Sequence, residues 1–340
     1  MTDTALAQQP PSRKTGPRPN RGRMALWILR RLLEGLLLLL IVSFLIFAAT
    51  QALPGDVARL ILGKEATPDQ LAVVREQLGL DQPFVTRYLD WLLGVLHGDL
   101  GYSISSRMPV LDLVVPRIAN SLTIVVASMA CTLPFAIWLG VASANRRDGP
   151  LDRISLLLSL AINAMPDFVL ALLLVVLLAT NVFHLLPAIS VLSPSASLWS
   201  QWTRLVLPVI TLFLLQSSYL YRLIRASMID VLNSDYIEFA RLKGLSPRRI
   251  LFRHALPNAV VPAIQAAATV FAFSVGGVVV IEYVFAFPGI GTALTDAVRY
   301  RDIEVVQFIV LMIAGTFFIA NTLADILAML LSVPTRGRSK

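Results

Sequence analysis

The sequence contains few of the residues from which metal and catalytic sites are usually built. Of its 340 residues, one is cysteine, Cys131, and three are histidines, His97, His184 and His254. A lone cysteine can form neither an intrachain disulfide nor a cysteine-based metal cluster. Each histidine is isolated in its sequence neighbourhood, a pattern that favours a packed or interfacial side chain over a metal ligand or a general base. We therefore expect no metal site in this chain.

Motifs for nucleotide and metal chemistry are missing as well. The chain has no GxxxxGK[ST] phosphate loop, no HExxH pair and no paired cysteines. These are the short motifs that bind ATP phosphates, a catalytic zinc ion or a metal cluster. We expect a non-catalytic protein that binds no cofactor itself.

Charged residues are also scarce, at 15% of the chain against about 25% in soluble domains. Hydrophobic residues make up 56%, and the mean hydropathy is +0.72. Because a bilayer-spanning helix takes about 20 apolar residues, the chain is predicted to be an integral membrane protein. Six runs serve as candidate spans: Leu32–Thr50, Leu122–Ala144, Ile154–Phe183, Leu205–Tyr221, Ala259–Ile281 and Val305–Val333. An even number of spans puts both termini on one side.

The distribution of Lys and Arg predicts which side that is, because cytoplasmic loops accumulate these residues. Twenty of the 29 Lys and Arg, with only six acidic residues, lie in one set of segments: 1–31, 145–153, 222–258 and 334–340. The other set holds nine Lys and Arg with twelve acidic residues: 51–121, 184–204 and 282–304. We expect both termini in the cytoplasm. Anionic lipid on that face accounts for the high pI without a nucleic acid.

The chain divides into five parts. Residues 1–23 are rich in Pro and Arg without apolar periodicity, so we expect a disordered basic cytoplasmic tail. The remaining parts are a first membrane helix (24–50), an outer segment (51–121), a five-helix core (122–333) and a cytoplasmic tail (334–340). A signal peptide cleaved near Ala49 is disfavoured, because the apolar run is long for a signal core. Cleavage would also place the arginine-rich segments on opposite sides of the membrane.

The outer segment, residues 51–121, carries helix signals of its own. Thr67–Gln70 has the spacing of a capping box with proline at the first helical position, which predicts a helix start. A second helix is predicted from Pro83 toward Gly98. The segment is small for an independent domain. We expect it to lie against the outer ends of the spans, where its Tyr and Trp side chains suit the membrane interface.

The most distinctive stretch is Asp235–Asn258, which we call the basic segment and which lies between the fourth and fifth predicted spans. Asp235 followed by Glu238 has capping-box spacing and predicts a short helix. Gly244 can end that helix in a left-handed conformation. A soluble, cationic segment with apolar side chains is thus placed at a membrane surface.

A second helix of the basic segment is predicted to start at Ser246 and Pro247, which suit the N-cap and the first helical position. Leu256-Pro257 should end or kink it. We therefore expect two short helices at an angle. Five cations make the segment basic: Arg241, Lys243, Arg248, Arg249 and Arg253.

Three roles are open to the basic segment. DNA binding is disfavoured, because both ends are tethered to spans by a few residues and a recognition helix must project into a groove. A cationic loop lying on lipid is a second possibility. We favour docking into a soluble partner, in which the exposed apolar side chains would be buried.

Charges within the spans cost several kcal/mol unless they are paired or face water. For Asp167, a lining of the transport pathway and a structural role both remain open, whereas for Glu282 and Asp325 a helix-to-helix hydrogen bond is favoured. Gly276 and Gly277 permit close helix approach. The candidates for a translocation pathway are Asp167, Gly276, Gly277 and Glu282.

Four prolines interrupt the predicted spans at positions 134, 166, 208 and 262. Breaks of this kind are common both in proteins that change conformation and in membrane helices generally, so they do not by themselves indicate a function. Glu34 lies one turn beyond Arg30 in the first predicted span, which predicts an intrahelical ion pair.

The basic segment resembles the EAA motif of permease subunits in bacterial ABC importers. That pattern runs Glu-Ala-Ala, Gly and Ile-x-Leu-Pro, and the sequence matches it at Glu238, Ala240, Gly244 and Leu256-Pro257. Phe239 and His254 depart from the pattern, as the sequence has Phe and His at these positions. The departures leave a docking role intact and put the side-chain contacts at both positions in question.

Further motifs resemble the dipeptide, oligopeptide and nickel permeases, and the likeness extends from Met24 nearly to the C-terminus. They are Leu53-Pro54-Gly55-Asp56, Gly79-Leu80-Asp81-Gln82-Pro83, Gly98-Asp99-Leu100-Gly101 with Ser103, Phe285-Ala286-Phe287-Pro288-Gly289-Ile290-Gly291, and Arg301-Asp302 with Val305-Val306-Gln307. Each motif is weak alone, and together they are specific.

The resemblance implies an all-α, six-helix permease of the type I ABC importer fold in the bacterial inner membrane. It implies four kinds of partner: a second permease, two cytoplasmic ATPases that bind ATP and Mg, a secreted or periplasmic binding protein, and membrane lipid. Its ATPase-coupling loop maps onto twelve residues: Asp235, Tyr236, Glu238, Phe239, Ala240, Lys243, Gly244, Ser246, Pro247, Arg248, Leu256 and Pro257. The implied cargo is a dipeptide or oligopeptide, with glutathione, nickel chelates and oligosaccharides as alternatives.

Two hypotheses of other classes stay open at this point. An ion-coupled carrier acting alone would use Asp167 and Glu282 as proton sites and would transport without ATP. A membrane-tethered scaffold would move no solute even with partners. The carrier acting alone would leave the structured basic segment facing the cytoplasm unexplained.

Overall fold

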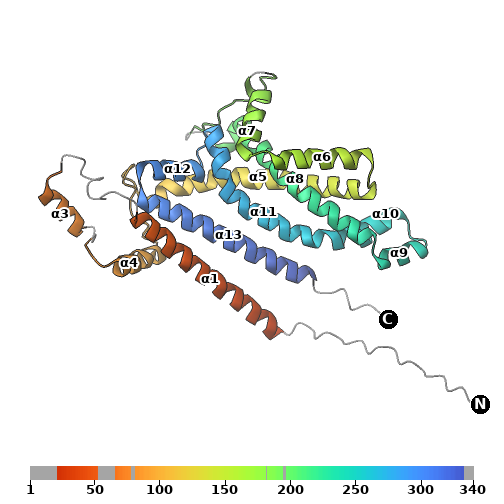
Figure 1. Cartoon of the computed structure of the whole chain (residues 1–340), viewed down its shortest axis with the longest axis horizontal. Helices are drawn as coiled ribbons and strands as arrows, with labels where there is room; N and C mark the ends of the chain where they lie inside the picture. The colour runs from red at the N-terminus through yellow and green to blue at the C-terminus, as the bar shows by residue number, and fades with distance from the viewer. Residues whose placement is uncertain (1–20, 53–65, 78–80, 181, 194–196, 333–340) are drawn as a thin grey trace, which may run out of the picture.

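The computed structural model describes residues 21–52, 66–77, 81–180, 182–193 and 197–332, and each of these ranges except 182–193 is mainly helical (Figure 1). The described residues form no strand, and a single isolated bridge joins Tyr102 to Pro109. The predicted all-α class is confirmed. The expectations for the tails at 1–20 and 334–340 and for Leu53-Pro54-Gly55-Asp56 lie outside the described residues.

Five helices are long and apolar enough to cross a bilayer, or six if one bent pair counts as a single span. The five are α1 (Arg21–Gln51), α5 (Val110–Asn145), α8 (Trp202–Leu232), α11 (Leu256–Phe285) and α13 (Ile303–Ser332). The bent pair is α6 (Pro150–Ala164) with α7 (Asp167–Val175) and the π-helical turn η1 (Val176–Thr180). The predicted membrane protein of six spans agrees with the second count.

The third predicted span is not one straight helix. Its two halves, α6 and α7, meet at 107°. The break lies at Met165 and Pro166, whose ψ angles of 138° and 143° are extended. Proline has no N–H for the helical ladder and pushes the preceding residue out of the α region. The expectation of interruptions at all four prolines was wrong, because α5, α8 and α11 continue through positions 134, 208 and 262.

The outer segment contains α3 (Pro68–Gln77) and α4 (Phe84–His97). The predicted capping box forms: the Thr67 amide donates to Gln70 Oε1 at 3.0 Å, and the Gln70 amide donates to Thr67 Oγ1 at 3.4 Å. Gly98 ends α4 at φ 83°. Aromatic contacts join α4 to the C-terminal half of α1, with Phe47 5.6 Å from Tyr88 between ring centroids. The segment therefore lies against a span, as expected.

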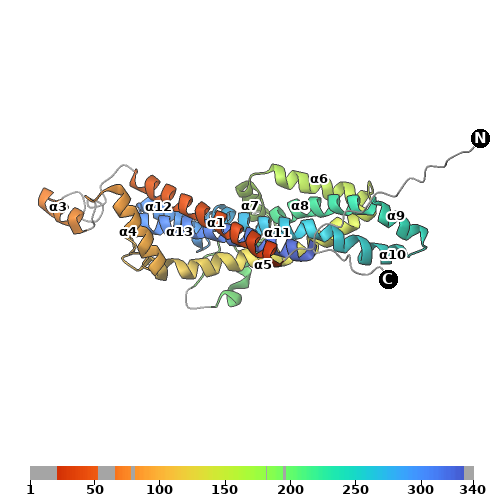
Figure 2. The same cartoon turned by 90° about the horizontal axis from the view of Figure 1, so that it is seen from below.

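The two ends of the bundle carry different elements (Figures 1 and 2). One end holds α9 (Asp235–Leu242) and α10 (Pro247–Arg249), with the first residues of α1 and the last of α13. The other end holds α3, α4 and α12 (Ile290–Tyr300). The basic and outer segments thus lie at opposite ends, as the alternation of spans requires.

Between the ends, buried side chains form three apolar clusters. The first joins α5, α7, α8 and α11, and the second joins α5, α8, α11 and the basic segment. Close approach of α5 to α8 depends on Gly140, where a Cβ would lie 2.7 Å from Ile224. The clusters leave much of α1 exposed, including Leu33, Leu37 and Leu45, whereas most of the described side chains of α13 are half-buried or buried.

Candidate functional site

The basic segment begins with α9, one residue away from the predicted start. Ser234 is the N-cap at ψ 148°, and its hydroxyl donates to the Val231 carbonyl instead of accepting from α9. Asp235 and Glu238 both lie in the first turn. The capping box predicted for this pair is therefore wrong. Their negative charges still favour the positive end of the helix dipole.

Gly244 ends α9 as predicted, with φ 74°. The Leu245 amide donates to the Ala240 carbonyl at 3.2 Å, and the Gly244 amide donates to the Arg241 carbonyl at 2.9 Å. This pair of bonds is a Schellman motif, which places a left-handed residue directly after the helix. A Cβ at Gly244 would meet no atom within 4 Å, so only backbone conformation selects glycine there.

The second half of the basic segment continues into the membrane. From α10 the chain runs through the π-helical turn η3 (Ile250–Ala255) into α11 without a sharp break. Of the two outcomes expected at Leu256-Pro257, an end or a kink of the helix, the end was wrong. Pro257 lies in the first turn of α11, where the missing N–H costs little, and the wider π turn precedes it. The basic segment is one short helix joined by a tight turn to the extended end of α11.

The inner face of the basic segment is fixed in the bundle by apolar packing. Ile237 and Ala255 are completely buried and belong to the cluster that includes Met228 of α8. Asn258 Nδ2 donates to the Tyr236 hydroxyl at 3.1 Å and ties α9 to α11. α9 is thereby attached to two of the long apolar helices, α8 and α11.

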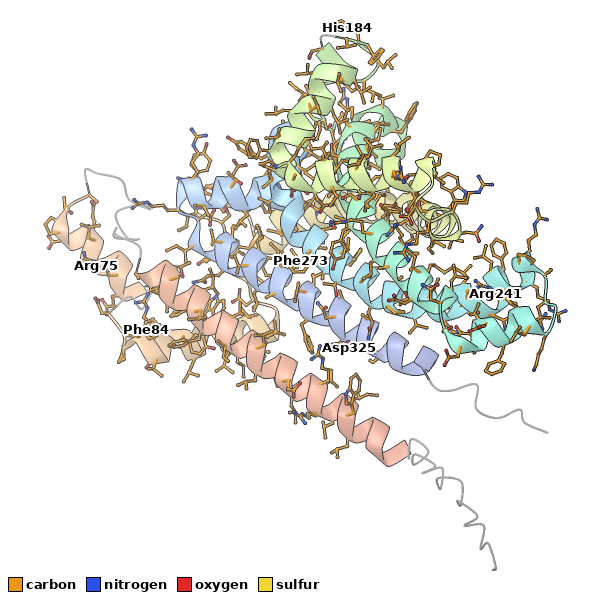
Figure 3. The ribbon with its side chains drawn as sticks, turned by 45° about the vertical axis from the view of Figure 1, so that its right-hand side comes forward. Arg75, Phe84, His184, Arg241, Phe273 and Asp325 are labelled. Carbon is orange, nitrogen blue, oxygen red and sulfur yellow. The ribbon has the colours of Figure 1, made fainter. Side chains whose placement is uncertain are left out.

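The outer face of the basic segment is apolar, cationic and exposed. Phe239, Leu242 and Phe252 are 64%, 77% and 61% exposed. Figure 3 shows Arg241 at this end of the molecule. Of the twelve residues predicted for coupling, one is buried, Ala240, and one is half-buried, Leu256. The other ten are exposed: Asp235, Tyr236, Glu238, Phe239, Lys243, Gly244, Ser246, Pro247, Arg248 and Pro257.

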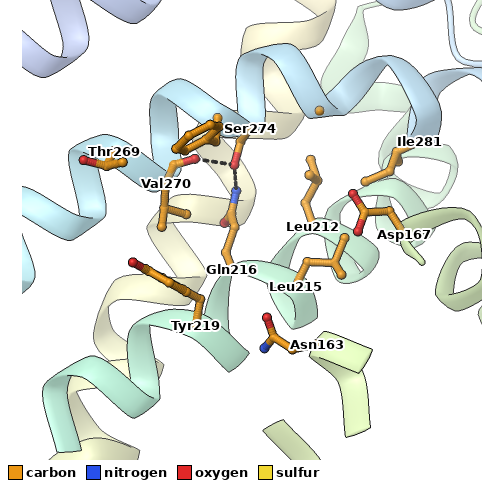
Figure 4. A pocket seen from close by; sticks show the side chains of 12 residues that line it. Asn163, Asp167, Leu212, Leu215, Gln216, Tyr219, Thr269, Val270, Ser274 and Ile281 are labelled. Carbon is orange, nitrogen blue, oxygen red and sulfur yellow. Dashed lines mark hydrogen bonds between the residues drawn. The ribbon is translucent and has the colours of Figure 1, made fainter. Parts of the chain in front are cut away.

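A second candidate site is a cavity of about 320 Å³ at the bend between α6 and α7, bounded by α8 and α11 (Figure 4). Two of the four predicted pathway residues, Asp167 and Gly277, line it. The rest of the lining is Asn163, Leu212, Leu215, Gln216, Tyr219, Thr269, Val270, Phe273, Ser274 and Ile281. Figure 3 places Phe273 in the middle of the bundle, away from both ends.

The other two predicted pathway residues lie outside this lining. Glu282 is completely buried and accepts from Ser121 Oγ at 2.5 Å and from the Gly291 amide at 2.6 Å. It thus satisfies an amide at the start of α12, and the favoured helix-to-helix hydrogen bond is confirmed. A Cβ added to Gly276 would have one neighbour within 4 Å, the Ile313 side chain at 3.9 Å. The predicted close approach of helices is therefore absent at Gly276.

Two further charged residues that the sequence analysis singled out form ion pairs with Arg side chains of α1, toward the end of the bundle that carries α9. Asp325 accepts from Arg31 at 2.7 Å, and Glu34 accepts from Arg30 at 2.8 Å. The first pair joins α13 to α1, and the second lies within α1. Both agree with the structural roles predicted for them.

The sequence did not single out Asn163, Gln216 or Tyr219, because polar residues scattered over three helices have no common spacing. It also missed the ion pair of Arg225 with Asp152, whose two bonds measure 2.5 and 2.7 Å between residues 73 positions apart. No metal-binding group of three or more His, Cys, Asp or Glu residues occurs in the part of the chain that the structure describes.

Nearly the whole chain is similar to known proteins. A family model described as the binding-protein-dependent transport system inner membrane component matches residues 136–333, and the corresponding N-terminal model matches 24–136. The glutathione transport system permease protein GsiC of Salmonella choleraesuis is 36% identical over 301 residues, 88% of this chain and 95% of that protein. A probable peptide ABC transporter permease protein of Sinorhizobium fredii, y4tP, is 34% identical over 303 residues, 89% of this chain and 96% of its own length.

Proposed function

The chain belongs to the family of binding-protein-dependent transport system inner membrane components, and we propose that its basic segment docks a cytoplasmic ATPase. Membership makes it a multi-pass inner-membrane permease of an ABC transporter. The finer assignments concern which surface receives the ATPase, which cavity the solute crosses and which solute is carried.

One observation carries the docking proposal: the basic segment is anchored on one face and unpartnered on the other. Ile237 is buried in the bundle, whereas Phe239 and Leu242 of the same helix are mostly exposed. A helix that presents apolar anchors at i and i+3 suits a groove on a partner. The surrounding Arg and Lys side chains would disfavour burial in the membrane core.

The division of labour follows from the residues. Within this sequence no phosphate loop is present, so ATP and Mg are bound by two ATPase partners. A second permease completes the pathway, and a secreted or periplasmic binding protein delivers the solute. Because coupling is reciprocal, loaded binding protein on one side and nucleotide on the other must bias the same helix arrangement.

The proposed translocation pathway passes the cavity lined by Asp167 and Gly277. A broken span beside a cavity near mid-bundle is the arrangement that transporters use for substrate contact. The relatives' names mention glutathione and peptides, and a dipeptide or oligopeptide is the proposed cargo. Glutathione or a nickel chelate is the alternative, and uptake of each labelled solute by the complete complex with ATP inside decides between them.

Docking is tested by placing an acidic residue on the exposed face of α9. Leu242→Asp should lower the amount of ATPase that co-purifies with the permease about tenfold or more, as loss of an apolar anchor does. Leu96→Asp is the matched control, since Leu96 is 73% exposed at the opposite end of the bundle, on α4. Equal ATPase recovery from both variants would contradict docking at α9.

Orientation is tested separately by reporter fusions. The proposal places the basic segment in the cytoplasm, so a reporter after Arg249 should be active only as a cytoplasmic fusion. A reporter after Ala72, in α3, should read as external. The reverse pattern would overturn the positive-inside assignment without affecting the family.

A further inference from the structure

We propose that the cavity at the α6–α7 bend binds the ammonium group of the transported solute, and that Asp167 recognises it. This inference rests on the proposed function, because it assigns a solute chemistry to the cavity proposed as the pathway. It goes further in giving the permease its own selectivity for charge, separate from that of the binding protein.

Most of the side-chain amide and hydroxyl donors that line the cavity are engaged by the protein, and among the described residues the Tyr219 hydroxyl is the exception. Gln216 Nε2 donates to Ser274 Oγ at 2.9 Å, and Ser274 Oγ donates to the Val270 carbonyl at 2.7 Å (Figure 4). Asn163 Nδ2 donates to Ser218 Oγ at 2.5 Å, and Thr269 Oγ1 donates to the Gln265 carbonyl at 3.1 Å. Few donors are left for a solute's carboxylate or phosphate.

Two side-chain acceptors of the lining, in contrast, are free, whereas Gln216 Oε1 accepts from Thr132 Oγ1. The Asp167 carboxylate has no hydrogen bond or ion pair with the described part of the chain, and the Asn163 side-chain oxygen has none either. The lining includes no Lys, Arg or His among the described residues. Apart from the Tyr219 hydroxyl, the unused polar groups of the cavity are therefore hydrogen-bond acceptors, and one of them carries a negative charge.

An ammonium group meets both needs, since it offers three donors and one positive charge and has no acceptor. The exposed Tyr219 and Phe273 rings add faces that attract an organic cation. A bare metal ion fits less well, because hard cations take six or more oxygen ligands. With Leu212, Leu215, Val270 and Ile281 in the same lining, the cavity suits an alkylammonium such as the N-terminus of a peptide.

A purely structural role for Asp167 is the competing explanation. Asp167 lies in the first turn of α7, where an acidic residue favours the helix dipole. Asp112 also lies in the first turn of its helix, α5, is also exposed, and lies outside the cavity lining. Both residues are acidic groups in a first helical turn and only Asp167 lines the cavity, so they form a matched pair for substitution.

The sign of the charge in the cavity can be measured without knowing the solute. In the assembled transporter, with Cys131→Ser as background, Gly277→Cys places a thiol in open space on the cavity wall. Methanethiosulfonate reagents carrying trimethylammonium or sulfonate then report the preference for cation over anion. Leu215→Cys is a second reporting position on α8 if the first variant assembles poorly.

Asp167→Asn should lower the ratio of cationic to anionic reaction rates about tenfold at either position, as removal of one nearby charge predicts. Asp112→Asn should leave the ratio unchanged. An unchanged ratio with Asp167→Asn would overturn the proposal, whatever the complex transports.

Uptake supplies the second readout, with labelled trialanine as the probe, the binding protein outside and ATP inside proteoliposomes. Asp167→Asn should lower uptake about tenfold, and Asp167→Glu, which keeps the charge, should restore at least half of it. Equal losses in both variants, or normal uptake by Asp167→Asn, would overturn ammonium recognition. A wild-type complex that moves no solute with ATP would instead contradict the proposed function, while the reagent ratio would still decide the charge of the cavity.

Discussion

At one end of the bundle α9 is held by apolar packing, whereas at the opposite end the chain is held by buried carboxylates. Ile237 of α9 is buried among aliphatic side chains, with one hydrogen bond from Asn258 to Tyr236 beside it. At the other end, Asp302 is 1% exposed and accepts from Ser103, Ile104 and Ser105. The same chain therefore uses two kinds of attachment.

The difference has a mechanical meaning. Apolar packing is non-directional, so α9 can shift against the bundle while most of its burial is kept. A buried carboxylate with several donors tolerates little movement, because each broken bond leaves an unpaired polar group. We infer that the α9 end is suited to receive motion and that the α12 end holds the outer loop in one place.

The largest effect is expected from Asp302→Ala. It leaves the Ser103 and Ser105 hydroxyls and two amides without their acceptor, which should destabilise the protein by about 3 kcal/mol or more. The midpoint of thermal unfolding of the purified complex should fall by about 6 °C or more. Asp112→Ala, an exposed control, should change it little, and equal midpoints for the two variants would contradict the rigid attachment.

A smaller effect at the same end is expected from Gly291→Ala. The added Cβ would lie 2.3 Å from the Val279 Cα, so backbone must move, at a cost of about 1–3 kcal/mol. Gly315→Ala in α13 is the matched control, because a Cβ there meets nothing within 4 Å. Thermal unfolding should separate the two, and an unaffected Gly291→Ala would show that α12 is not closely packed on α11.

At the α9 end, Gly244→Ala should cost about 1 kcal/mol, the usual penalty of a Cβ in a left-handed conformation. Gly244→Pro cannot adopt the observed φ of 74° at all. It should abolish the link between ATP hydrolysis and uptake while the spans remain inserted, as measured by uptake per ATP hydrolysed. Normal uptake with Gly244→Pro would remove the basic segment from the coupling account.

The smallest effect on stability is expected from Phe239→Ala. Its side chain is 64% exposed, so thermal unfolding of the permease alone should change by less than about 0.5 kcal/mol. Uptake should nevertheless fall, because the ATPase loses an apolar anchor. A variant that lost stability and uptake together would place Phe239 in the fold and not at the interface.

The sequence predicted several features that depend on local conformation, although the capping box expected at Asp235 and Glu238 does not form. The capping box at Thr67, the helix end at Gly98, the left-handed turn at Gly244 and the ion pair of Glu34 all follow from spacing within a few residues. The resemblance to peptide permeases also had a physical basis, since Ser103 and Asp302 from two of its motifs are hydrogen bonded.

Features that depend on tertiary packing were not predictable. Four prolines looked equivalent in the sequence, yet of these only Pro166 breaks its helix, whereas α5, α8 and α11 continue through the other three. The cavity gathers residues from α6, α7, α8 and α11, whose common face appears only once the helices are packed. The structural role predicted for Glu282 was correct, although the sequence could not identify its hydrogen-bond partner at the start of α12.

The central claim, that the exposed face of α9 docks an ATPase, is tested most directly by photo-cross-linking in intact membranes. Phe239 is replaced by benzoylphenylalanine, with the same replacement of Leu96 on α4 as control, and the adducts are identified after irradiation. The account predicts an adduct between position 239 and the ATPase chain and none from position 96. An ATPase present in the complex but absent from the position 239 adducts would contradict it.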